Sequence, residues 1–143
     1  MIHLKIKEFL QQNKAAMIAF RRQLHQHPEL SWEEVQTTKD IAAQLDEIGV
    51  SYKLTDPTGL IAEIKGGKPG KTVALRADID ALPVQELNDH IDYKSQIDGK
   101  MHACGHDTHA AMLLFAAKAL NQIKDELNGN VRLIFQPAEE TAL

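Results

Sequence analysis

The segment His102–His109 places three histidines, one thiol and one carboxylate within eight residues of a 143-residue chain. Thiolate and imidazole are both good ligands for zinc and similar first-row metals. Gly105 separates Cys104 from His106, and a glycine lets the backbone turn sharply enough for both to point at one centre. The same residues also fit an ordinary helix start, with Asp107 as the N-cap and Cys104 as a small buried side chain. Both interpretations stay open, although a structural zinc site is less favoured because such sites usually contain more cysteines.

Two adjacent carboxylates, Glu139 and Glu140, follow a predicted strand near the end of the sequence. Such a pair can divide two tasks, because one carboxylate can bind a metal while the other takes a proton from a metal-activated water. An acidic loop that leads into a helix N-terminus, where carboxylates favour the helix dipole, explains the same pair. Taken alone, the pair favours this second interpretation.

A third polar cluster comprises Arg76, Asp78 and Asp80, which alternation places on one side of an extended segment. These residues fit a salt-bridged strand end, or a group of acids that orients a ligand imidazole. Each of the three clusters lies at a plausible active edge of one sheet. Together their residue types fit a single site of metal-assisted hydrolysis.

The helices that must carry these clusters are indicated by apolar periodicity and by terminal residues. An amphipathic helix is predicted over about His3–His27, and Pro28 ends it because proline disfavours helix in the preceding residue. Ser31 and Glu34 then have the spacing of a capping box at the start of a second helix. Gly49 supplies a left-handed stop for that helix.

Beyond this stop the periodicity changes to that of strands. The predicted strands are Val50–Leu54, Gly59–Ile64, Thr72–Arg76 and Val131–Phe135. The run Thr72–Arg76 is continuously apolar apart from its ends, as expected inside a sheet covered on both faces. An irregular surface excursion is predicted over about 85–100, and a helix rich in Ala, Met and Leu over about 107–127. Alternating strands and helices predict an α/β fold with a partly parallel sheet flanked by helices, in which chemistry gathers at the carboxyl ends of strands.

Composition excludes several functional classes. With 43% hydrophobic and 25% charged residues, the chain is typical of one soluble globular domain. A net charge of -4 without a basic patch predicts that nucleic acid is not a partner. We also expect no membrane association, because no apolar stretch approaches the roughly 20 residues of a bilayer span and no secretory signal is visible. The single cysteine, Cys104, favours a reducing, cytoplasmic location.

Four motifs occur in an order that resembles the peptidase M20 family. They are Arg22–Ser31, Leu75–Pro83, Met101–His109 and Phe135–Glu140. The resemblance covers essentially the whole chain and is to the aminoacylase-like branch, which includes hippurate hydrolases, N-acetyl-diaminopimelate deacetylases and auxin-conjugate amidohydrolases. It implies the N-terminal portion of a zinc-peptidase-like catalytic domain.

The resemblance further implies a site with two divalent metals, drawn from Mn²⁺, Zn²⁺, Co²⁺ or Ni²⁺, that hydrolyses the amide bond of small N-acyl amino acids. The metal ligands carried over by position are Cys104, His106 and Glu140. Glu139 takes the position of the general base that later protonates the leaving amine. Where the broader family has a His-x-Asp triplet, this chain has Arg76-Ala77-Asp78, so Asp78 is a candidate supporting acid without the histidine.

Members of this family are longer than the present chain. We therefore expect residues 1–143 to be a partial catalytic domain that lacks an inserted lid or dimerisation domain and the C-terminal half. An exposed sheet edge and apolar face would make the chain a homo-oligomer. The alternative to an amidohydrolase is a catalytically silent α/β fragment with a structural or self-associating role. A cysteine hydrolase with Cys104 as nucleophile and His106 as base is a more distant alternative, because residues so close in sequence rarely reach attack geometry.

Overall fold

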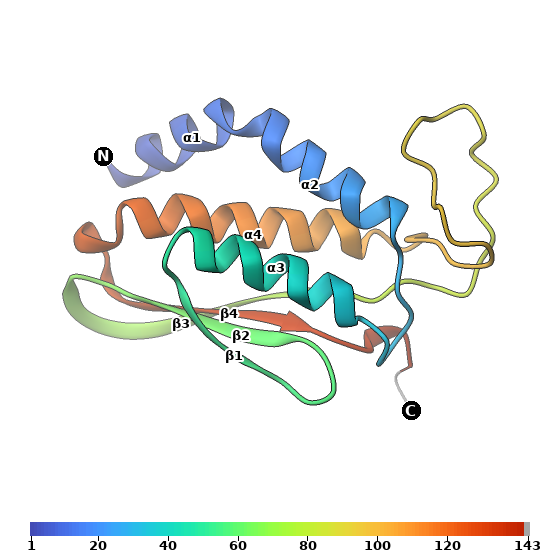
Figure 1. Ribbon diagram of the computed structural model, residues 1–143. Coiled ribbons are helices and arrows are strands. Elements are labelled where there is room, and N and C mark those ends of the chain that lie inside the picture. Colours follow the sequence, from blue (N-terminus) through green and yellow to red (C-terminus); the bar gives the residue numbers. More distant parts are fainter. Residues whose placement is uncertain (142–143) are drawn as a thin grey trace.

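The computed structural model describes residues 1–141 as one four-stranded sheet with its α-helices on one side (Figure 1). The helices are α1 (Ile2–Gln12), α2 (Lys14–Gln26), α3 (Val35–Glu47) and α4 (His106–Gln122). The strands are β1 (Ser51–Leu54), β2 (Leu60–Lys65), β3 (Lys68–Asp78) and β4 (Asn128–Gln136). Two short 3-10 helices are η1 (Lys124–Glu126) and η2 (Glu139–Thr141). Within residues 1–141, none of the helices combines the length and apolarity that a bilayer crossing requires.

The sheet has the strand order β1-β2-β4-β3. The two pairings made by β2 are antiparallel, whereas β3 and β4 run parallel with Asp78 opposite Gln136. This parallel pair brings the carboxyl ends of β3 and β4 to the same edge of the sheet. The predicted α/β fold with a partly parallel sheet flanked by helices is confirmed, although most of the pairing is antiparallel.

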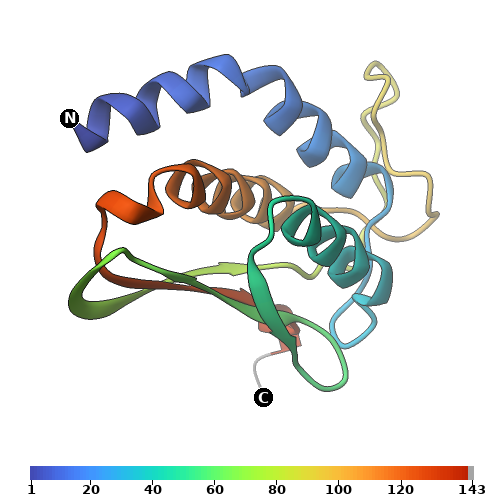
Figure 2. The same cartoon turned by 60° about the vertical axis from the view of Figure 1, so that its left-hand side comes forward.

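The hydrophobic core lies between this sheet and α4. Figures 1 and 2 show α3 and α4 directly over the sheet, with α1 and α2 as an outer layer across α4. The fully buried side chains of the core include Leu45, Leu60, Leu114, Leu133 and Phe135. Burying a side chain of this size contributes about 1.5–3 kcal/mol to stability. The packing therefore fixes α4, and with it the residues at its first turn, against the ends of β3 and β4.

The placement of β3 corrects one expectation. The apolar run Thr72–Arg76 was expected inside a sheet covered on both faces, but in the part of the chain that the structure describes β3 is an edge strand that pairs only with β4. Its side chains are largely exposed, with Val73 at 57% and Leu75 at 37% of their full accessible area. A continuous apolar run cannot report what covers a strand, and within residues 1–141 the α-helices cover only one face.

The N-terminal helix prediction was correct in extent but wrong in continuity. The segment predicted as one helix over about His3–His27 is divided at Asn13, whose side-chain Nδ2 donates a hydrogen bond to the Phe9 carbonyl at 2.8 Å. The backbone N–H of Asn13 keeps its bond to the same carbonyl at 3.0 Å, and the helix is divided by the backbone of Asn13, whose φ of -107° and ψ of 12° depart from helical values. Only α2 contributes buried residues, so α1 is a peripheral extension of it.

The start of α3 also differs from its prediction. The helix begins at Val35, and the side chain of its N-cap residue Glu34 makes no capping hydrogen bond. The Glu29 carboxylate caps it instead, by accepting from the backbone N–H groups of Gln36 at 3.0 Å and Thr37 at 2.6 Å. Ser31 and Glu34, expected to form a capping box, instead turn their side chains to other parts of the molecule. Gly49 has the expected left-handed conformation, with φ of +70°, directly after this helix.

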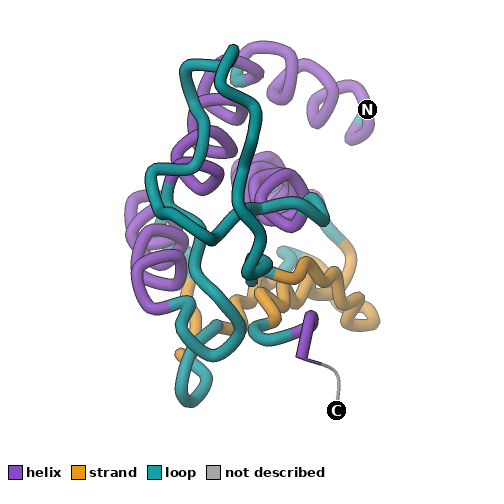
Figure 3. Tube along the Cα trace, turned by 90° about the vertical axis from the view of Figure 1, so that its right-hand side faces the viewer, coloured by secondary structure: helices purple, strands orange, loops and turns teal. Residues whose placement is uncertain are grey.

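The segment over 85–100 is the predicted surface excursion and contains no helix or strand. A bridge between Leu82 and Met101 closes its base, so the chain leaves and returns at one point. Figure 3 shows this long loop beside the C-terminal end of α2 and above the start of α4. After the excursion, α4 ends at Gln122, five residues before the predicted end at about 127, because η1 and the early start of β4 occupy the intervening segment.

Candidate metal centre

The three predicted clusters meet at the edge where β3 and β4 end and α4 begins. Gly105 is the N-cap residue of α4 and has a φ of +117°, a conformation that strains residues with a side chain. This sharp turn places His106 in the first turn of α4 with its ring buried, while Cys104 stays exposed just before the turn. The sharp turn expected at Gly105 is present, while its role in a metal site stays a prediction.

The ring of His106 has a defined orientation. Its Nδ1 lies 2.9 Å from the backbone oxygen of Asp80 and 3.1 Å from the Asp80 Oδ1. Both partners are acceptors, so Nδ1 must carry the hydrogen. The opposite nitrogen, Nε2, faces three carboxylate oxygens, at 3.6 Å from Glu139, 3.8 Å from Glu140 and 3.9 Å from Asp78. These separations are too long for hydrogen bonds.

The side chains around Nε2 form two overlapping donor sets. Cys104, His106 and Glu140 offer ligand atoms that all lie within 4.8 Å of one another, and so do Asp78, His106 and Glu139. Two nitrogen or oxygen ligands on one tetrahedral zinc are separated by about 3.4 Å, given bonds of about 2.0–2.2 Å. The separations from Nε2 are close to this value, so the residues fit a divalent cation. Since one lone pair binds one cation, His106 can serve only one of the two sets at a time.

Negative charge accumulates at this edge of the sheet. Four carboxylates surround the His106 ring: Asp78, Asp80, Glu139 and Glu140. Among residues 1–141, Arg76 is the only arginine or lysine in an ion pair with them, and it binds Asp78 Oδ1 at 2.7 Å. The pKa of the Cys104 thiol is raised by its hydrogen bond to Glu140, by burial, and by the charges of Glu139 and Asp80. A bound divalent cation would offset this repulsion and favour the thiolate.

The structure thus brings together all five predicted site residues, and their individual roles stay predictions. Two buried acids support this arrangement: Asp80, which the sequence interpretation placed in the third polar cluster, and Glu34, which it did not assign to the site. The backbone N–H of Glu140 donates to Asp80 Oδ2 at 2.9 Å, and the N–H of Ala138 donates to Glu34 Oε2 at 2.7 Å. The two bonds flank Glu139 and hold the segment in place. Asp80 belonged to a recognised motif, but no local signal distinguished Glu34 from a helix-capping residue.

Burial disfavours the ionised form of Glu34. The pKa of its carboxyl group is raised, chiefly by burial, although hydrogen bonds from backbone groups, including Ala138, and from the Thr58 hydroxyl act in the opposite direction. Thr58 precedes β2 and donates to Glu34 Oε1 at 3.0 Å. This acid therefore connects the turn before α3 with the segment after β4.

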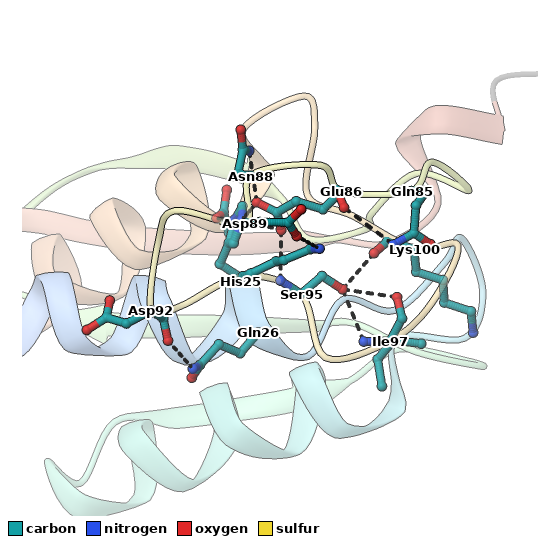
Figure 4. A network of polar contacts seen from close by, with 12 residues as sticks. His25, Gln26, Gln85, Glu86, Asn88, Asp89, Asp92, Ser95, Ile97 and Lys100 are labelled. Carbon is teal, nitrogen blue, oxygen red and sulfur yellow. Dashed lines mark hydrogen bonds and ion pairs between the residues drawn. The ribbon is translucent and has the colours of Figure 1, made fainter.

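A second polar network lies behind the first turn of α4 and is centred on His25. Its Nδ1 contacts Asp107 Oδ2 at 2.8 Å, and its Nε2 contacts Glu86 Oε1 at 3.0 Å. Figure 4 shows His25 beside Glu86, which also accepts hydrogen bonds from the Asn88 side chain and the Ser95 backbone. The idea that Asp107 is the N-cap of α4 is wrong, because Gly105 holds that position.

The charges of this network compensate one another. The pKa of His25 is raised by its hydrogen bond to Asp107, against the effect of burial, and then by Glu86. For Asp107 and Glu86, burial is the largest influence and acts to raise the pKa, yet hydrogen bonds and nearby positive groups outweigh it and leave the pKa lowered. Arg21 adds a further ion pair, with its Nε 2.8 Å from Asp107. The network joins α2, the 85–100 excursion and α4.

Comparisons with known proteins agree with this geometry. The sequence model of peptidase family M20/M25/M40 matches residues 74–143. The chain is 49% identical over 138 residues to thermostable carboxypeptidase 2 of Saccharolobus solfataricus, covering 95% of this chain and 35% of that protein. It is 54% identical over 129 residues to the N-acetylcysteine deacetylase of Bacillus subtilis, covering 88% and 33%.

Among solved structures, the Bacillus subtilis YxeP protein, described as a dinuclear metal binding peptidase from the M20 family, superposes with a TM-score of 0.83 at 51% identity. The alignment covers 94% of this chain and 36% of that one. The chain therefore spans about a third of the length of these relatives.

Proposed function

Because the chain belongs to peptidase family M20/M25/M40, as its motifs predicted, we propose that it contributes to a metal-dependent amidohydrolase. The substrates are N-acyl amino acids, and the bond cleaved is the amide between the acyl group and the amino acid. One observation carries this proposal: His106 Nε2 faces carboxylates from three separate segments at distances that suit a shared cation. Two relatives, an N-acetylcysteine deacetylase and an N-acyl-L-amino acid amidohydrolase, support this substrate class.

The complete site holds two divalent cations, drawn from Mn²⁺, Zn²⁺, Co²⁺ or Ni²⁺. The dinuclear description of the YxeP protein supports this number. Cys104, His106 and Glu140 are the proposed ligands. Asp78 lies on the Nε2 side of the ring, so we assign it to the cation side of the site and not to the support of the imidazole.

The residues of the proposed site have separate tasks in the reaction. When bound, the cations supply Lewis acidity toward the scissile carbonyl and lower the pKa of water. Glu139 takes a proton from the attacking water and passes it to the leaving amine. Its side chain is 41% exposed and its Oε2 lies 3.6 Å from His106 Nε2, so it is accessible both to substrate and to the site. The bonds from Ala138 and Glu140 to buried acids fix its backbone.

We further propose that residues 1–143 form a partial catalytic domain, with an inserted lid or dimerisation domain and a C-terminal half outside this sequence. The coverage of about a third of each relative supports this assignment. Homo-oligomerisation through the exposed edge strand β3 and a cytoplasmic location stay predictions.

A second candidate activity is removal of the C-terminal amino acid from a peptide. It is favoured by relatives named thermostable carboxypeptidases, at 49% and 50% identity. A peptide is itself an acylated amino acid, so the same residues would act on the same kind of bond. The size and charge of the accepted acyl group distinguish the two activities.

The decisive experiment compares wild-type chain with Glu139→Gln, using N-acetyl amino acids and dipeptides as substrates with added Mn²⁺ or Zn²⁺. We expect turnover to fall by about 10²–10⁴-fold in Glu139→Gln, while metal content by elemental analysis is unchanged. Asp98→Asn, an exposed acid of the excursion, serves as the control and keeps full turnover. Wild-type turnover in Glu139→Gln would rule out Glu139 as the general base. No turnover by any form of the chain would favour the alternative of a catalytically silent fragment.

A further inference from the structure

We propose that the chain carries a second binding site on its outer surface, a groove for a small carboxylate with a short apolar chain. The groove lies between α2, α4 and the 85–100 excursion, and its volume is about 340 Å³. Figure 3 shows the excursion beside the C-terminal end of α2 and above the start of α4, so the three segments meet here. We call this cavity the arginine groove, because Arg21 and Arg22 are among the residues that line it.

The arginine groove is positively charged, although the chain has a net charge of -4. Among residues 1–141, two arginines and no acidic residue line it. The Nε of Arg21 lies 2.8 Å from Asp107 Oδ2, so one of the two positive charges is partly balanced. Within the same part of the chain, no carboxylate forms an ion pair with the exposed Arg22. The guanidinium of Arg22 is therefore available to an anion.

Tyr93 orders the two guanidinium groups. The Cζ of Arg22 lies 4.4 Å from the centroid of the Tyr93 ring, and the Cζ of Arg21 lies 5.5 Å from it. Both distances are within the range of cation–π contacts. The Tyr93 ring in turn packs edge-on against the buried ring of His25, with 5.7 Å between the centroids. The planar donors of arginine match a carboxylate, and a guanidinium that is already held in place loses little freedom when it binds one.

The other wall of the arginine groove is apolar. It includes Met17 and Ile18 of α2 and Met112 of α4. Ile18 keeps 37% and Met112 keeps 56% of its accessible area. A hydrocarbon chain that covers these side chains would remove apolar surface from water, which favours binding. Methionine side chains are flexible and can adapt to the shape of such a ligand.

The two walls together select the class of ligand. An inorganic anion would use the arginines but leave the apolar wall in water, and a neutral apolar molecule would leave Arg22 without a counter-charge. A volume of about 340 Å³ lies near the lower end of the range for small-molecule sites, so the ligand is a short organic acid and not a polymer. Free alkyl acids and N-acyl amino acids share this chemistry.

The arginine groove is separate from the candidate metal centre. Cys104, His106 and the Glu139–Glu140 pair do not line it. The only connection is through Asp107, which follows His106 in α4 and forms the ion pair with Arg21. The inference therefore stands or falls independently of the proposed function.

The test is a titration of metal-free chain with sodium hexanoate, followed through the methionine methyl groups by ¹H–¹³C NMR. Removing metal prevents the acid from binding to a cation at the other site. Of the four methionines, Met17 and Met112 line the arginine groove. Met1 and Met101 lie outside it and serve as internal references. We expect saturable shifts of the first two signals and none of the references, with each signal assigned by its loss in a methionine-to-leucine variant.

Two substitutions in α2 separate the site from a general effect of charge. Arg22→Gln removes the unpaired guanidinium and should weaken hexanoate binding by about 10–100-fold, as expected for a hydrogen-bonded charge. Lys14→Gln is the matched control, because it removes the same charge from an exposed position of the same helix outside the groove. This control should bind hexanoate as the wild-type chain does. Equal affinities of the two variants would overturn the proposal.

Acetate and 1-hexanol test the two walls one at a time. Each has only one part of hexanoate, so each should bind at least about tenfold more weakly. Affinity equal to that of hexanoate for either compound would overturn the proposal, as would a hexanoate titration that leaves Met17 and Met112 unshifted. Once hexanoate binding is established, N-hexanoylglycine identifies the source of the ligand. Tighter binding than hexanoate points to an N-acyl amino acid, and weaker binding points to a free acid.

Discussion

Two histidines of this chain, His25 and His106, are both buried and both lie between carboxylates, yet their environments differ. Both ring nitrogens of His25 are hydrogen bonded, to Asp107 at 2.8 Å and to Glu86 at 3.0 Å. Within residues 1–141, only Nδ1 of His106 is hydrogen bonded, and the acids that face its Nε2 stay 3.6–3.9 Å away. We call His25, Asp107 and Glu86 the closed cluster. We call His106 and the groups around its Nε2, which are Asp78, Cys104, Glu139 and Glu140, the open cluster.

The difference is one of charge compensation. Around His25, the two carboxylates face the imidazole and the guanidinium of Arg21, so each negative charge has a positive partner. Around His106, carboxylates face one another across a gap that would suit a cation, and their charges help to hold the Cys104 thiol protonated. A compensated cluster of this kind stabilises the fold, whereas an uncompensated one indicates a site that binds an ion.

The largest expected effect comes from breaking the closed cluster around His25. His25→Leu leaves Asp107 and Glu86 buried without their shared partner, which should lower the free energy of unfolding by roughly 3–5 kcal/mol. Urea unfolding monitored by circular dichroism measures this loss. His27→Leu, at an exposed position two residues away, is the control and should change stability by less than about 0.5 kcal/mol. Equal stability of the two variants would mean that the His25 network does not hold the fold together.

The open cluster should respond to metal in a way that the closed one does not. Zn²⁺ at about 100 times its dissociation constant should raise the free energy of unfolding by about 2.7 kcal/mol. If Cys104→Ala binds Zn²⁺ 100-fold more weakly, the same Zn²⁺ concentration should raise the free energy of unfolding of this variant by only about 0.4 kcal/mol. Asn88→Ala removes one hydrogen bond to Glu86 in the closed cluster. It should lower the free energy of unfolding of the metal-free chain by about 1 kcal/mol and leave the stabilisation by Zn²⁺ unchanged. If Asn88→Ala loses the stabilisation by Zn²⁺ while Cys104→Ala keeps it, the assignment of metal binding to the open cluster is wrong.

The sequence predicted the open cluster far better than the closed one. Cys104, His106, Glu139 and Glu140 were identified because their types and spacing are unusual, and the fold brings the start of α4 beside the segment after β4. His25 lies in the motif Arg22–Ser31, but the sequence did not indicate its partners, which lie 61 and 82 residues away along the chain. Charge pairing between distant residues leaves no periodic pattern, so it becomes visible only in the fold.

The same limit applies to burial. Thr72–Arg76 has the composition of an interior strand, but β3 lies at an edge, because composition cannot report which neighbours are present. Ser31 and Glu34 have the spacing of a capping box, yet they bind Asp80 and the segment after β4. Local rules predicted the elements and most of their ends. They failed where a polar side chain had a distant partner that bound it more effectively than its own helix.

The smallest expected effect is a pH dependence that belongs to the closed cluster. The pKa of His25 is raised above its ordinary value of 6.5, chiefly by the hydrogen bond to Asp107. A histidine of this kind contributes its full stabilisation below its unfolded pKa and loses it as pH rises through the folded one. Asp107 and Glu86, with lowered pKa values, stay ionised throughout this range.

Between about pH 6 and pH 9, in the presence of a chelator, the free energy of unfolding of wild-type chain should therefore decline. The slope for one proton is at most about 1.4 kcal/mol per pH unit. His25→Gln cannot bind this proton. At pH 6 its free energy of unfolding should therefore be lower than that of the wild-type chain, and it should not decline as the pH rises to 9. Urea midpoints measured for both proteins across the range provide the test. If both proteins lose stability in parallel as the pH rises, the charge on His25 is not what balances Asp107 and Glu86.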